Sequence, residues 1–466
     1  MKVVSSYPVR LSKLTKEQRR RLEDTDAKYN EAVRFLLPII DNEWNVIAVT
    51  DDKKLRQRIC ETLIHETKTN PKPKYLEFDE KFENFPCYYR RAAVTAAIGA
   101  VSSYKSNYQN WLENGQHGEA PKLGIPHQPA PFYNGNMFSW DDSYPTKAKL
   151  KVLVDDKSTW DWIEVELRLT DVQYIKHHCS EMVRSAPTLR KKGKVWSLSF
   201  AFTINVSLTD AALENQRVLG VDLGVNTDAT VVVMESNGTV IARKFIDFAS
   251  DKGSMYHRLG YVRRAQSHGS RNLFKMWQRV NDANEQLSIK ISKAIVDMAI
   301  EYSCDVIVME YLDMTGKIRG SQKQRLAIWR KRDVQKRVEH LAHRCGMRFS
   351  RVCAWNTSRL AFDGSGRVKR GSEIAARDGV RFGYGTVEFA TGKLYSADLN
   401  AAYNVAARYF VRGFLKALSE KSRSALEAKV PSGLSGSTVT LASLISLNKE
   451  LGGHACQGTG NSQEAA

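Results

Sequence analysis

The stretch RVLGVDLGVNTDATVVVM, residues 217–234, decides the fold of the second half of this chain. Two apolar runs flank a segment that contains Gly and Asn, which predicts a strand, a tight turn and a second strand. Continuous apolar runs are typical of strands buried on both faces of a sheet. Asp222 stands inside the first run. A buried carboxylate is costly unless it is paired or bound to a metal ion, so this position indicates chemistry as well as fold.

Two more acidic residues have similar surroundings. Glu310 ends a buried strand in CDVIVMEYLD, residues 304–313, and Asp398 begins a helix in DLNAAYNVAARYFVRGFLKAL, residues 398–418. A purely structural role would explain each acid separately: Asp222 would cap a turn, Glu310 would form a salt bridge, and Asp398 would be a helix N-cap. Together, three carboxylates in one α/β domain favour a shared cation, and such hard oxygen ligands hold Mg²⁺ or Mn²⁺. Two ions about 4 Å apart would suit hydrolysis of a phosphodiester.

The charge of the chain points to a polyanionic partner. Among 466 residues, 70 Lys and Arg oppose 51 Asp and Glu, so the formal net charge is 70 − 51 = +19. Nucleic acid is the first candidate and an anionic membrane surface the second. The chain is 42% hydrophobic, which is enough for packed cores, and its length predicts two to four domains.

Secretion and membrane spanning are not indicated. The first residues contain no apolar segment before a cleavage site, and no uninterrupted stretch of about 18 apolar residues follows. Seven cysteines are scattered without paired spacing, which is typical of reduced thiols. We therefore expect a cytoplasmic protein without a membrane partner.

The first half of the chain shows a different pattern. A strand is expected within residues 1–14, and Thr15 with Gln18 forms a capping box that begins a helix. A second long helix is expected from about Pro86 to Trp111, so residues 15–125 are mainly helical. Five prolines between residues 121 and 145 predict a loop, and strict alternation follows, so residues of about 126–210 form a β-rich module.

The three acidic motifs resemble those of the RuvC nuclease domain in transposon-encoded TnpB proteins and compact type V CRISPR effectors. GVDLGVNT surrounds Asp222, IVMEYLD surrounds Glu310, and DLNAAYNVAAR at Asp398 resembles the family's specific D-x-N-A-A signature. The resemblance covers about residues 1–415. It implies a multidomain α+β fold: a β-barrel wedge domain from residues 1–14 and 126–210, a helical recognition domain over 15–125, and an RNase H-like (RuvC) α/β domain over 211–416. Residues 417–466 are expected to be a partly disordered tail.

The same resemblance implies a function. Asp222, Glu310 and Asp398 would be the catalytic, metal-binding residues of an RNA-guided DNA endonuclease that uses two Mg²⁺ or Mn²⁺ ions. Its partners would be a guide RNA and target DNA, with a trans-acting RNA as a further possibility. Guide pairing would read the target sequence, and the protein would read a short flanking motif.

One departure from the family concerns zinc. Family members usually carry two CxxC pairs between the second and third acidic motifs. Here that interval holds only Cys345 and Cys353, and the matching segments read NTSRLAFDGSGRVKRG, residues 356–371, and VEFATGKLY, residues 387–395. We therefore predict no zinc and a zinc-free hairpin at about residues 350–396. Four aromatic residues are expected to hold this hairpin by packing: Trp355, Phe362, Tyr384 and Phe389.

Three basic stretches are candidate nucleic-acid contacts. The first would form a stripe on a helix just after Glu310, because its members recur every seven residues: Lys323, Arg330, Arg337 and Arg344. The second precedes Glu310 and contains Arg263, Arg264 and Arg271. The third leads into a strand of the β-rich module and contains Lys191 and Lys192. In a less basic chain, the stripe of Lys323, Arg330, Arg337 and Arg344 would be interpreted simply as the solvent-exposed face of a helix.

Aromatic residues are candidates for stacking on unpaired bases. Trp329 lies beside Arg330 and is the best of them. Tyr104, Tyr108 and Trp111 have the spacing of a buried helical stripe, so packing is expected of them instead.

Two alternative functions remain open at this point. VDLGVNT also resembles the phosphate-binding hairpin of actin-like ATPases and sugar kinases, but DGSG at Asp363 is the only approximation to the second Gly-rich loop that those proteins need. That alternative also leaves Asp398 and the charge unexplained. The other alternative is a guide-dependent DNA-binding protein that does not cut, such as a repressor, and only the retained acidic triad opposes it.

Overall fold

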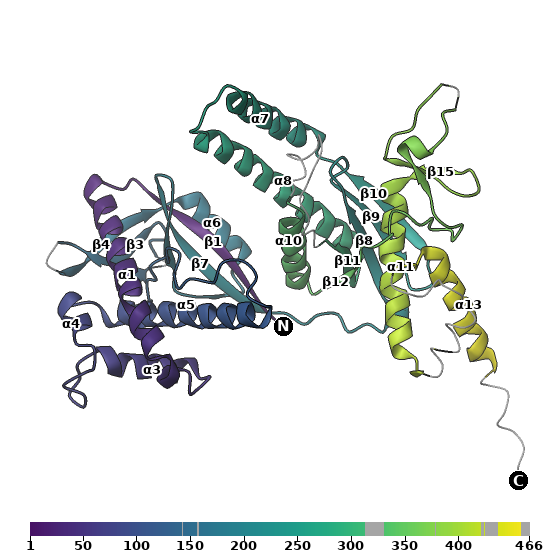
Figure 1. The fold of residues 1–466 in the computed structure, drawn as a ribbon. Coiled ribbons are helices and arrows are strands. Elements are labelled where there is room, and N and C mark those ends of the chain that lie inside the picture. Colours follow the sequence, from purple (N-terminus) through teal and green to yellow (C-terminus); the bar gives the residue numbers. More distant parts are fainter. Residues whose placement is uncertain are drawn as a thin grey trace, which may run out of the picture. The chain divides into compact units, whose positions relative to one another are not determined.

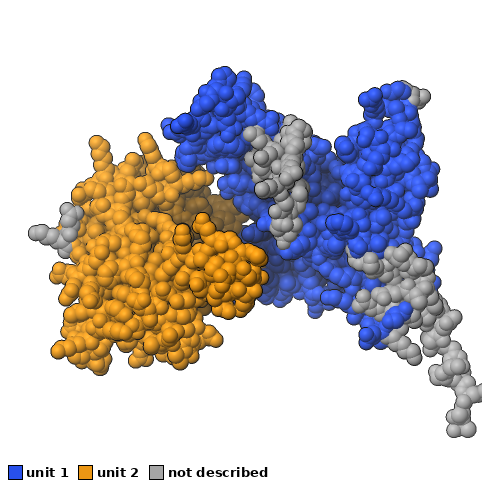
Figure 2. All heavy atoms as spheres, in the orientation of Figure 1, with its two compact units in different colours: residues 1, 205–466 blue, residues 2–204 orange. Residues whose placement is uncertain are grey.

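The computed structural model describes residues 1–141, 143–155, 158–312, 330–377, 379–420, 424 and 437–457, without the side chains of residues 452–457 (Figure 1). The chain divides into two compact units (Figure 2). The amino-terminal unit comprises residues 2–204, and the carboxyl-terminal unit comprises residue 1 and residues 205–466. No helix of the described residues is long and apolar enough to cross a membrane.

The amino-terminal unit is built on a seven-stranded sheet. Its strand order is β2-β3-β4-β1-β7-β5, and β6 pairs with β7. The strands are β1 (Lys2–Ser12), β2 (Phe138–Trp140), β3 (Lys147–Leu153), β4 (Trp160–Leu167), β5 (Val183–Arg184), β6 (Thr188–Lys192) and β7 (Val195–Asn205). Among the strand pairs of described residues, none joins β2 to β5. The order is therefore that of an open path, and the closure expected of a barrel stays a prediction.

Helices fill the interval between β1 and β2. They are α1 (Lys16–Asn42), α2 (Trp44–Ile47), α3 (Lys53–Ile64), α4 (Glu77–Lys81) and α5 (Cys87–Glu113), and α6 (Leu169–His178) follows β4. The capping box is confirmed, because Thr15 and Gln18 exchange side-chain to backbone hydrogen bonds of 2.8 and 3.1 Å. The helices and the sheet share one hydrophobic core.

The expected buried stripe of α5 ends before the helix does. Val94, Ala97 and Val101 are buried, whereas Tyr108 is 37% exposed. The aromatic rings further along α5 contact each other: the ring centroids of Tyr104 and Tyr108 are 5.9 Å apart, and those of Tyr108 and Trp111 are 5.6 Å apart. Packing into the core was therefore the wrong expectation for Tyr108.

The carboxyl-terminal unit contains a five-stranded mixed sheet of order β10-β9-β8-β11-β12. Its strands are β8 (Arg217–Leu223), β9 (Ala229–Glu235), β10 (Val240–Ile246), β11 (Val306–Tyr311) and β12 (Arg348–Cys353). The predicted strand, turn and strand of residues 217–234 are confirmed, since β8 and β9 pair antiparallel. β11 runs parallel to both β8 and β12, so these three strands end at one edge of the sheet.

Helices cover both faces of this sheet (Figure 1). One face packs against α7 (Ala249–Ser267), α8 (Phe274–Glu301) and α10 (Lys331–Arg344). The other face packs against α11 (Ala397–Ala417) and α13 (Leu441–Gln457). Two short 3₁₀ turns, Leu213–Asn215 and Gly371–Glu373, complete the unit.

The last segment of the chain is more ordered than the sequence suggests. Helix α13 lies beside α11, and its leucines at Leu441, Leu444 and Leu447 are buried in the same core. The expected tail beginning at residue 417 therefore contains a packed helix. The leucine spacing of three residues was the signal for it.

The segment of residues 350–396 forms a small sheet of β13 (Lys369–Arg370), β14 (Thr386–Glu388) and β15 (Leu394–Ser396). Phe362 and Phe389 pack in its core, as expected, with ring centroids 5.4 Å apart. Trp355 and Tyr384 do not, because they are 70% and 72% exposed. Two of the four predicted packing contacts were thus wrong.

Candidate active site

Strand register brings Asp222 and Glu310 together. Met309 on β11 pairs with Val221 on β8, so the next residues of the two parallel strands, Glu310 and Asp222, are neighbours. Side chains alternate along a strand, and Val221 and Met309 belong to the core on the α8 face. Asp222 and Glu310 therefore emerge on the opposite face, which is the face that α11 covers.

Helix α11 approaches β8 unusually closely at Gly220. A Cβ atom at Gly220 would lie 2.7 Å from the Cβ of Ala406 and 2.9 Å from the carbonyl oxygen of Ala402. Only glycine fits there, and small residues on α11 complete the contact. The first glycine of GVDLG and two alanines of the Asp398 motif thus set the distance between the strand and the helix that carry two of the acids.

Asp398 lies in the first turn of α11, but it does not cap that helix. The N-cap is Ser396, whose side chain accepts a hydrogen bond from the backbone N–H of Leu399 at 3.4 Å. The local explanation of Asp398 as an N-cap was therefore wrong. Its carboxylate is free to serve the site, and a negative charge is favoured near a helix N-terminus.

The three carboxylates interact electrostatically. Burial raises the pKa of Asp222 well above its usual range, and repulsion from Glu310 and then from Asp398 raises it further, while Arg370 lowers it. Part of the Asp222 side chain still touches solvent, although protein atoms surround it. Because Asp222 is repelled by both other acids, Glu310 and Asp398 each lie near it.

The other two acids have a hydroxyl partner each. Burial raises the pKa of Glu310, and a hydrogen bond from the Thr357 hydroxyl opposes that shift. Burial also raises the pKa of Asp398, and a hydrogen bond from Thr227 and the charge of Arg370 oppose it. Sequence reasoning missed Thr227, Thr357 and Arg370.

A polar framework from α11 holds the loop that carries Thr357. Asn404, which is fully buried, donates to the carbonyl oxygens of Thr357 and Leu360, both at 2.9 Å. Asn400, also fully buried, donates to the carbonyl oxygen of Leu360 at 2.8 Å. The two asparagines of the D-x-N-A-A-x-N pattern thus fix the partner of Glu310 rather than touching the acids themselves.

Arg408 ties the same loop down from further along α11. Its Nη1 donates to the carbonyl oxygens of Cys353 and Trp355 at 2.6 and 2.8 Å, and its Nε donates to that of Val439 at 3.1 Å. Arg408 is 4% exposed. A buried cation that binds carbonyl oxygens of two segments needs those segments in place, so it rigidifies them.

The turn after Asp222 is held by Lys252 of α7. Lys252 donates to the carbonyl oxygen of Asn226 and forms ion pairs with Asp228 at 3.4 Å and with Asp247 at 2.5 Å. Lys252 and Asp228 are both buried. This turn carries Thr227, so Lys252 indirectly positions the partner of Asp398.

The three carboxylates have the chemistry that a divalent cation needs. Carboxylate oxygens are the ligands that Mg²⁺ and Mn²⁺ prefer, and a cation would relieve the repulsion that raises the pKa of Asp222. Among the described residues, however, no three His, Cys, Asp or Glu side chains are spaced so that they could hold a metal ion.

The basic residues predicted to bind nucleic acid are spread over both units. Arg263 and Arg264 are exposed on α7, and Arg271 is exposed between α7 and α8. Arg264 lies over the Tyr261 ring at 4.6 Å. Beside it, Arg258 and Arg279 line a surface recess of about 550 Å³ with Tyr261 and Met276.

Three of the four residues of the predicted stripe are described, and they lie at the start of helix α10 and within it. Helix α10 begins at Lys331, so Arg330 is its N-cap residue and only Arg337 and Arg344 lie within it. Lys323 and Trp329 lie outside the described residues. Arg337 is engaged in ion pairs with Asp333 at 3.1 Å and with Glu285 at 3.4 Å. The seven-residue spacing suggested a longer helix than α10.

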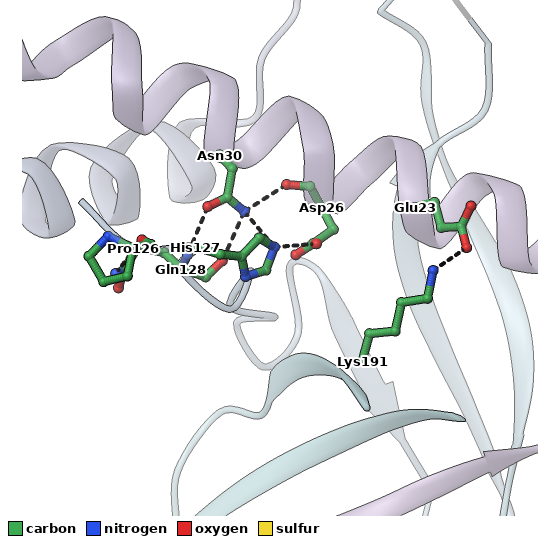
Figure 3. A network of polar contacts seen from close by, with 7 residues as sticks. All are labelled: Glu23, Asp26, Asn30, Pro126, His127, Gln128 and Lys191. Atoms are coloured by element: carbon green, nitrogen blue, oxygen red, sulfur yellow. Dashed lines mark hydrogen bonds and ion pairs between the residues drawn. The ribbon is translucent and has the colours of Figure 1, made fainter. Parts of the chain in front are cut away.

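Lys191 and Lys192 are exposed on β6 of the amino-terminal unit. Lys191 forms an ion pair with Glu23 of α1 at 2.5 Å, as Figure 3 shows. Beside this pair, His127 donates to Asp26 at 2.6 Å, and Asn30 binds the backbone of Gln128 at both its N–H and its carbonyl oxygen (Figure 3). Glu23 is thus paired with a cation, and Asp26 has a hydrogen-bond partner in His127.

Matches to known sequences are short. The model of the Aq_aa04 family matches residues 5–154. The uncharacterized protein aq_aa04 of Aquifex aeolicus (strain VF5) is 31% identical over 100 residues, which are 19% of this chain and 55% of that protein. The chain thus spans about half the length of this curated relative, and the family-model match ends before the three acids.

Matches to solved structures are long. The structure of a Cas12f1–sgRNA–target DNA complex has a TM-score of 0.52 and 14% identity, over 84% of this chain and 82% of that chain. Alicyclobacillus acidoterrestris C2c1 in complex with single-guide RNA has a TM-score of 0.42 and 10% identity, over 84% of this chain and 69% of that chain. The likeness to Cas12f1 concerns the fold, and it confirms the predicted multidomain α+β class.

Proposed function

We propose that this chain is an RNA-guided DNA endonuclease that hydrolyses phosphodiester bonds at Asp222, Glu310 and Asp398. The observation that carries the proposal is the convergence of these acids. Two occupy neighbouring positions on parallel strands, the third lies in the first turn of the helix on the same face, and Asp222 is repelled by both of the others. A fold gains no stability from such an arrangement, and strongly perturbed carboxyl groups are typical of functional sites.

Each side chain has a role in this proposal. The three carboxylates would hold one or two Mg²⁺ or Mn²⁺ ions. When bound, such ions would activate a water molecule and stabilise the leaving 3′ oxygen. Thr357 and Thr227 orient Glu310 and Asp398. Arg370 lies close enough to lower the pKa of Asp222 and of Asp398, and its guanidinium is held by the Ser358 hydroxyl and the Tyr384 carbonyl oxygen; a cation placed there would stabilise a scissile phosphate.

The partners follow from charge and fold. Cas12f1, whose fold is similar, was solved with a guide RNA and target DNA. A net charge of +19 supports polyanionic partners of this kind for the present chain. We therefore propose guide RNA and target DNA as partners, with base pairing reading the target sequence.

The proposal is tested by the RNA that copurifies with the protein. The chain is expressed beside its native flanking DNA, and the bound RNA is sequenced. We expect one discrete RNA species, and a DNA duplex matched to that RNA should be cut in the presence of Mg²⁺. If no discrete RNA copurifies, guidance by RNA is contradicted. Elemental analysis of the same sample tests the absence of zinc, which stoichiometric zinc would contradict.

Guided DNA binding without cleavage is the second candidate. The observation that favours it is the spacing of the acids, since no three such side chains of the described residues are arranged to hold a metal ion. Bound RNA together with an uncut, tightly bound target would support this candidate. Mg²⁺-dependent cleavage of that target would exclude it.

A further inference from the structure

We propose that Trp355 is a stacking platform for an unpaired base of single-stranded DNA next to the acidic site. The inference rests on the proposed function, because it concerns the strand that would be cut there. Trp355 is 70% exposed, and its ring contacts no aromatic ring or cation among the described residues. A tryptophan in water leaves a large apolar surface uncovered.

The backbone around Trp355 is rigid, in contrast to its exposed side chain. The carbonyl oxygens of Cys353 and Trp355 both accept hydrogen bonds from Nη1 of Arg408, at 2.6 and 2.8 Å. Asn356 adopts a left-handed φ of 63° and its carbonyl oxygen accepts two backbone N–H groups at 3.1 Å. An exposed ring on a fixed backbone is preorganised to bind, because little freedom is lost when a base stacks on it.

The position of Trp355 points to the same ligand. β12 ends at Cys353, at the edge of the sheet where β8 and β11 also end, so Trp355 lies just beyond the edge that carries Asp222 and Glu310. Trp355 is two residues from Thr357, which binds Glu310. Arg370 binds the Ser358 hydroxyl at 3.2 Å, so a cation accompanies the ring. An aromatic ring beside cations fits a single strand, whose bases are available to stack.

The experiment measures binding of a fluorescein-labelled oligodeoxythymidine by fluorescence anisotropy. The full chain is used in EDTA, so the result does not depend on cleavage and stands apart from a failure of the proposed function. We expect Trp355→Ala to weaken binding by about 5- to 100-fold. Trp355→Phe should lose less, because it keeps a ring. The matched control is Trp162→Ala, which removes a tryptophan that is 38% exposed in the other unit, and it should bind like wild type.

Two further readouts separate stacking from a general effect. The slope of affinity against salt should be the same for Trp355→Ala and wild type, because no phosphate contact is lost. Binding of a duplex of the same sequence should be unchanged, because its bases are not free to stack. Wild-type affinity of Trp355→Ala for the single strand, an equal loss on the duplex, or equal losses for the Ala and Phe variants would each overturn the proposal.

Discussion

Asp26 in the amino-terminal unit and Asp222 in the carboxyl-terminal unit are both partly buried acids, and their surroundings differ. Burial raises the pKa of Asp26, but the hydrogen bond and charge of His127 and the charge of Lys191 oppose that shift. Burial raises the pKa of Asp222 too, yet there the neighbouring Glu310 and Asp398 add to it. One acid is compensated by its neighbours, whereas the other is penalised by them.

The difference separates a structural network from a candidate active site. Around Asp26, polar partners reduce the cost of burial, as they do in most folded proteins. Around Asp222, like charges are gathered at a cost, and the framework of Asn400, Asn404 and Arg408 keeps the surrounding loop in place. Like charges placed close together reduce stability, and proteins retain such arrangements mainly at functional sites.

The largest effect in this comparison is expected from removing the Arg370 side chain beside Asp222, and none from removing the His127 ring beside Asp26. Arg370→Met should lower guided DNA cleavage by about 100- to 1,000-fold, because an electrostatic contact to the phosphate is lost. His127→Gln, its counterpart beside Asp26, should leave cleavage unchanged. Rates on one matched duplex measure both, with Arg367→Met as the control for charge on the same hairpin. Equal cleavage by Arg370→Met and wild type would remove Arg370 from the site.

A smaller loss is expected from Thr357→Val, which removes the hydroxyl that binds Glu310. Outer partners of metal ligands are typically worth about 10- to 100-fold in affinity or activity, and we expect a loss in that range. The Mg²⁺ concentration for half-maximal cleavage should rise as well. Thr391→Val, at an exposed position of the hairpin, is the matched control. A normal Mg²⁺ dependence of Thr357→Val would contradict the role of this hydroxyl.

The two acids should also differ in how they affect stability with pH. A carboxyl group whose pKa is raised by folding stabilises the protein below its unfolded value, near 3.8, and loses that contribution as pH rises through the raised pKa. In EDTA at neutral pH, Asp222→Asn should therefore raise the free energy of unfolding, by about 1–3 kcal/mol. Asp26→Asn should gain less, because His127 already compensates that acid.

Thermal unfolding at several pH values measures this difference. The gain in Tm for Asp222→Asn should shrink as the solution is acidified, because wild-type Asp222 then becomes protonated. A variant that is less stable than wild type at neutral pH would mean that the charge of Asp222 is compensated after all.

The smallest effect is expected at Lys191, beside the compensated network. Its exposed ion pair with Glu23 contributes at most about 1 kcal/mol to stability. If Lys191 contacts a phosphate of the RNA, as the sequence predicts, Lys191→Gln should reduce the slope of log K against log salt by about 1. An unchanged slope would mean that Lys191 contacts no phosphate of the RNA and only forms its ion pair with Glu23.

Strand pattern and motif order were enough to predict the acids. Alternation along β8 and β11 fixes which face Asp222 and Glu310 share, and the small residues after Asp398 indicate a closely packed helix. Thr357 and Arg370 come instead from residues 350–396, where short strands and turns leave no period to follow. Their positions depend on long-range hydrogen bonds from α11, which a linear sequence does not display.

Exposure was the least predictable property. Trp355 and Phe362 look alike as aromatic residues of one hairpin, yet one is exposed and the other packs against Phe389. The backbones of both residues are held by α11, at Trp355 by Arg408 and at Phe362 by Asn400, so the sequence pattern alone does not separate the two rings. For the segment of α13, the apolar patch from Val439 to Leu451 was visible in the sequence, but its serine- and glycine-rich surroundings favoured only partial order.

The central claim is that three acids form one catalytic site, and Asp222→Ala tests it most directly. Wild type and variant are loaded with the copurifying RNA, and binding and cleavage of a matched DNA duplex are measured in Mg²⁺. We predict equal loading and equal target binding, with cleavage lost in the variant alone. Cleavage by Asp222→Ala at the wild-type rate would contradict the account.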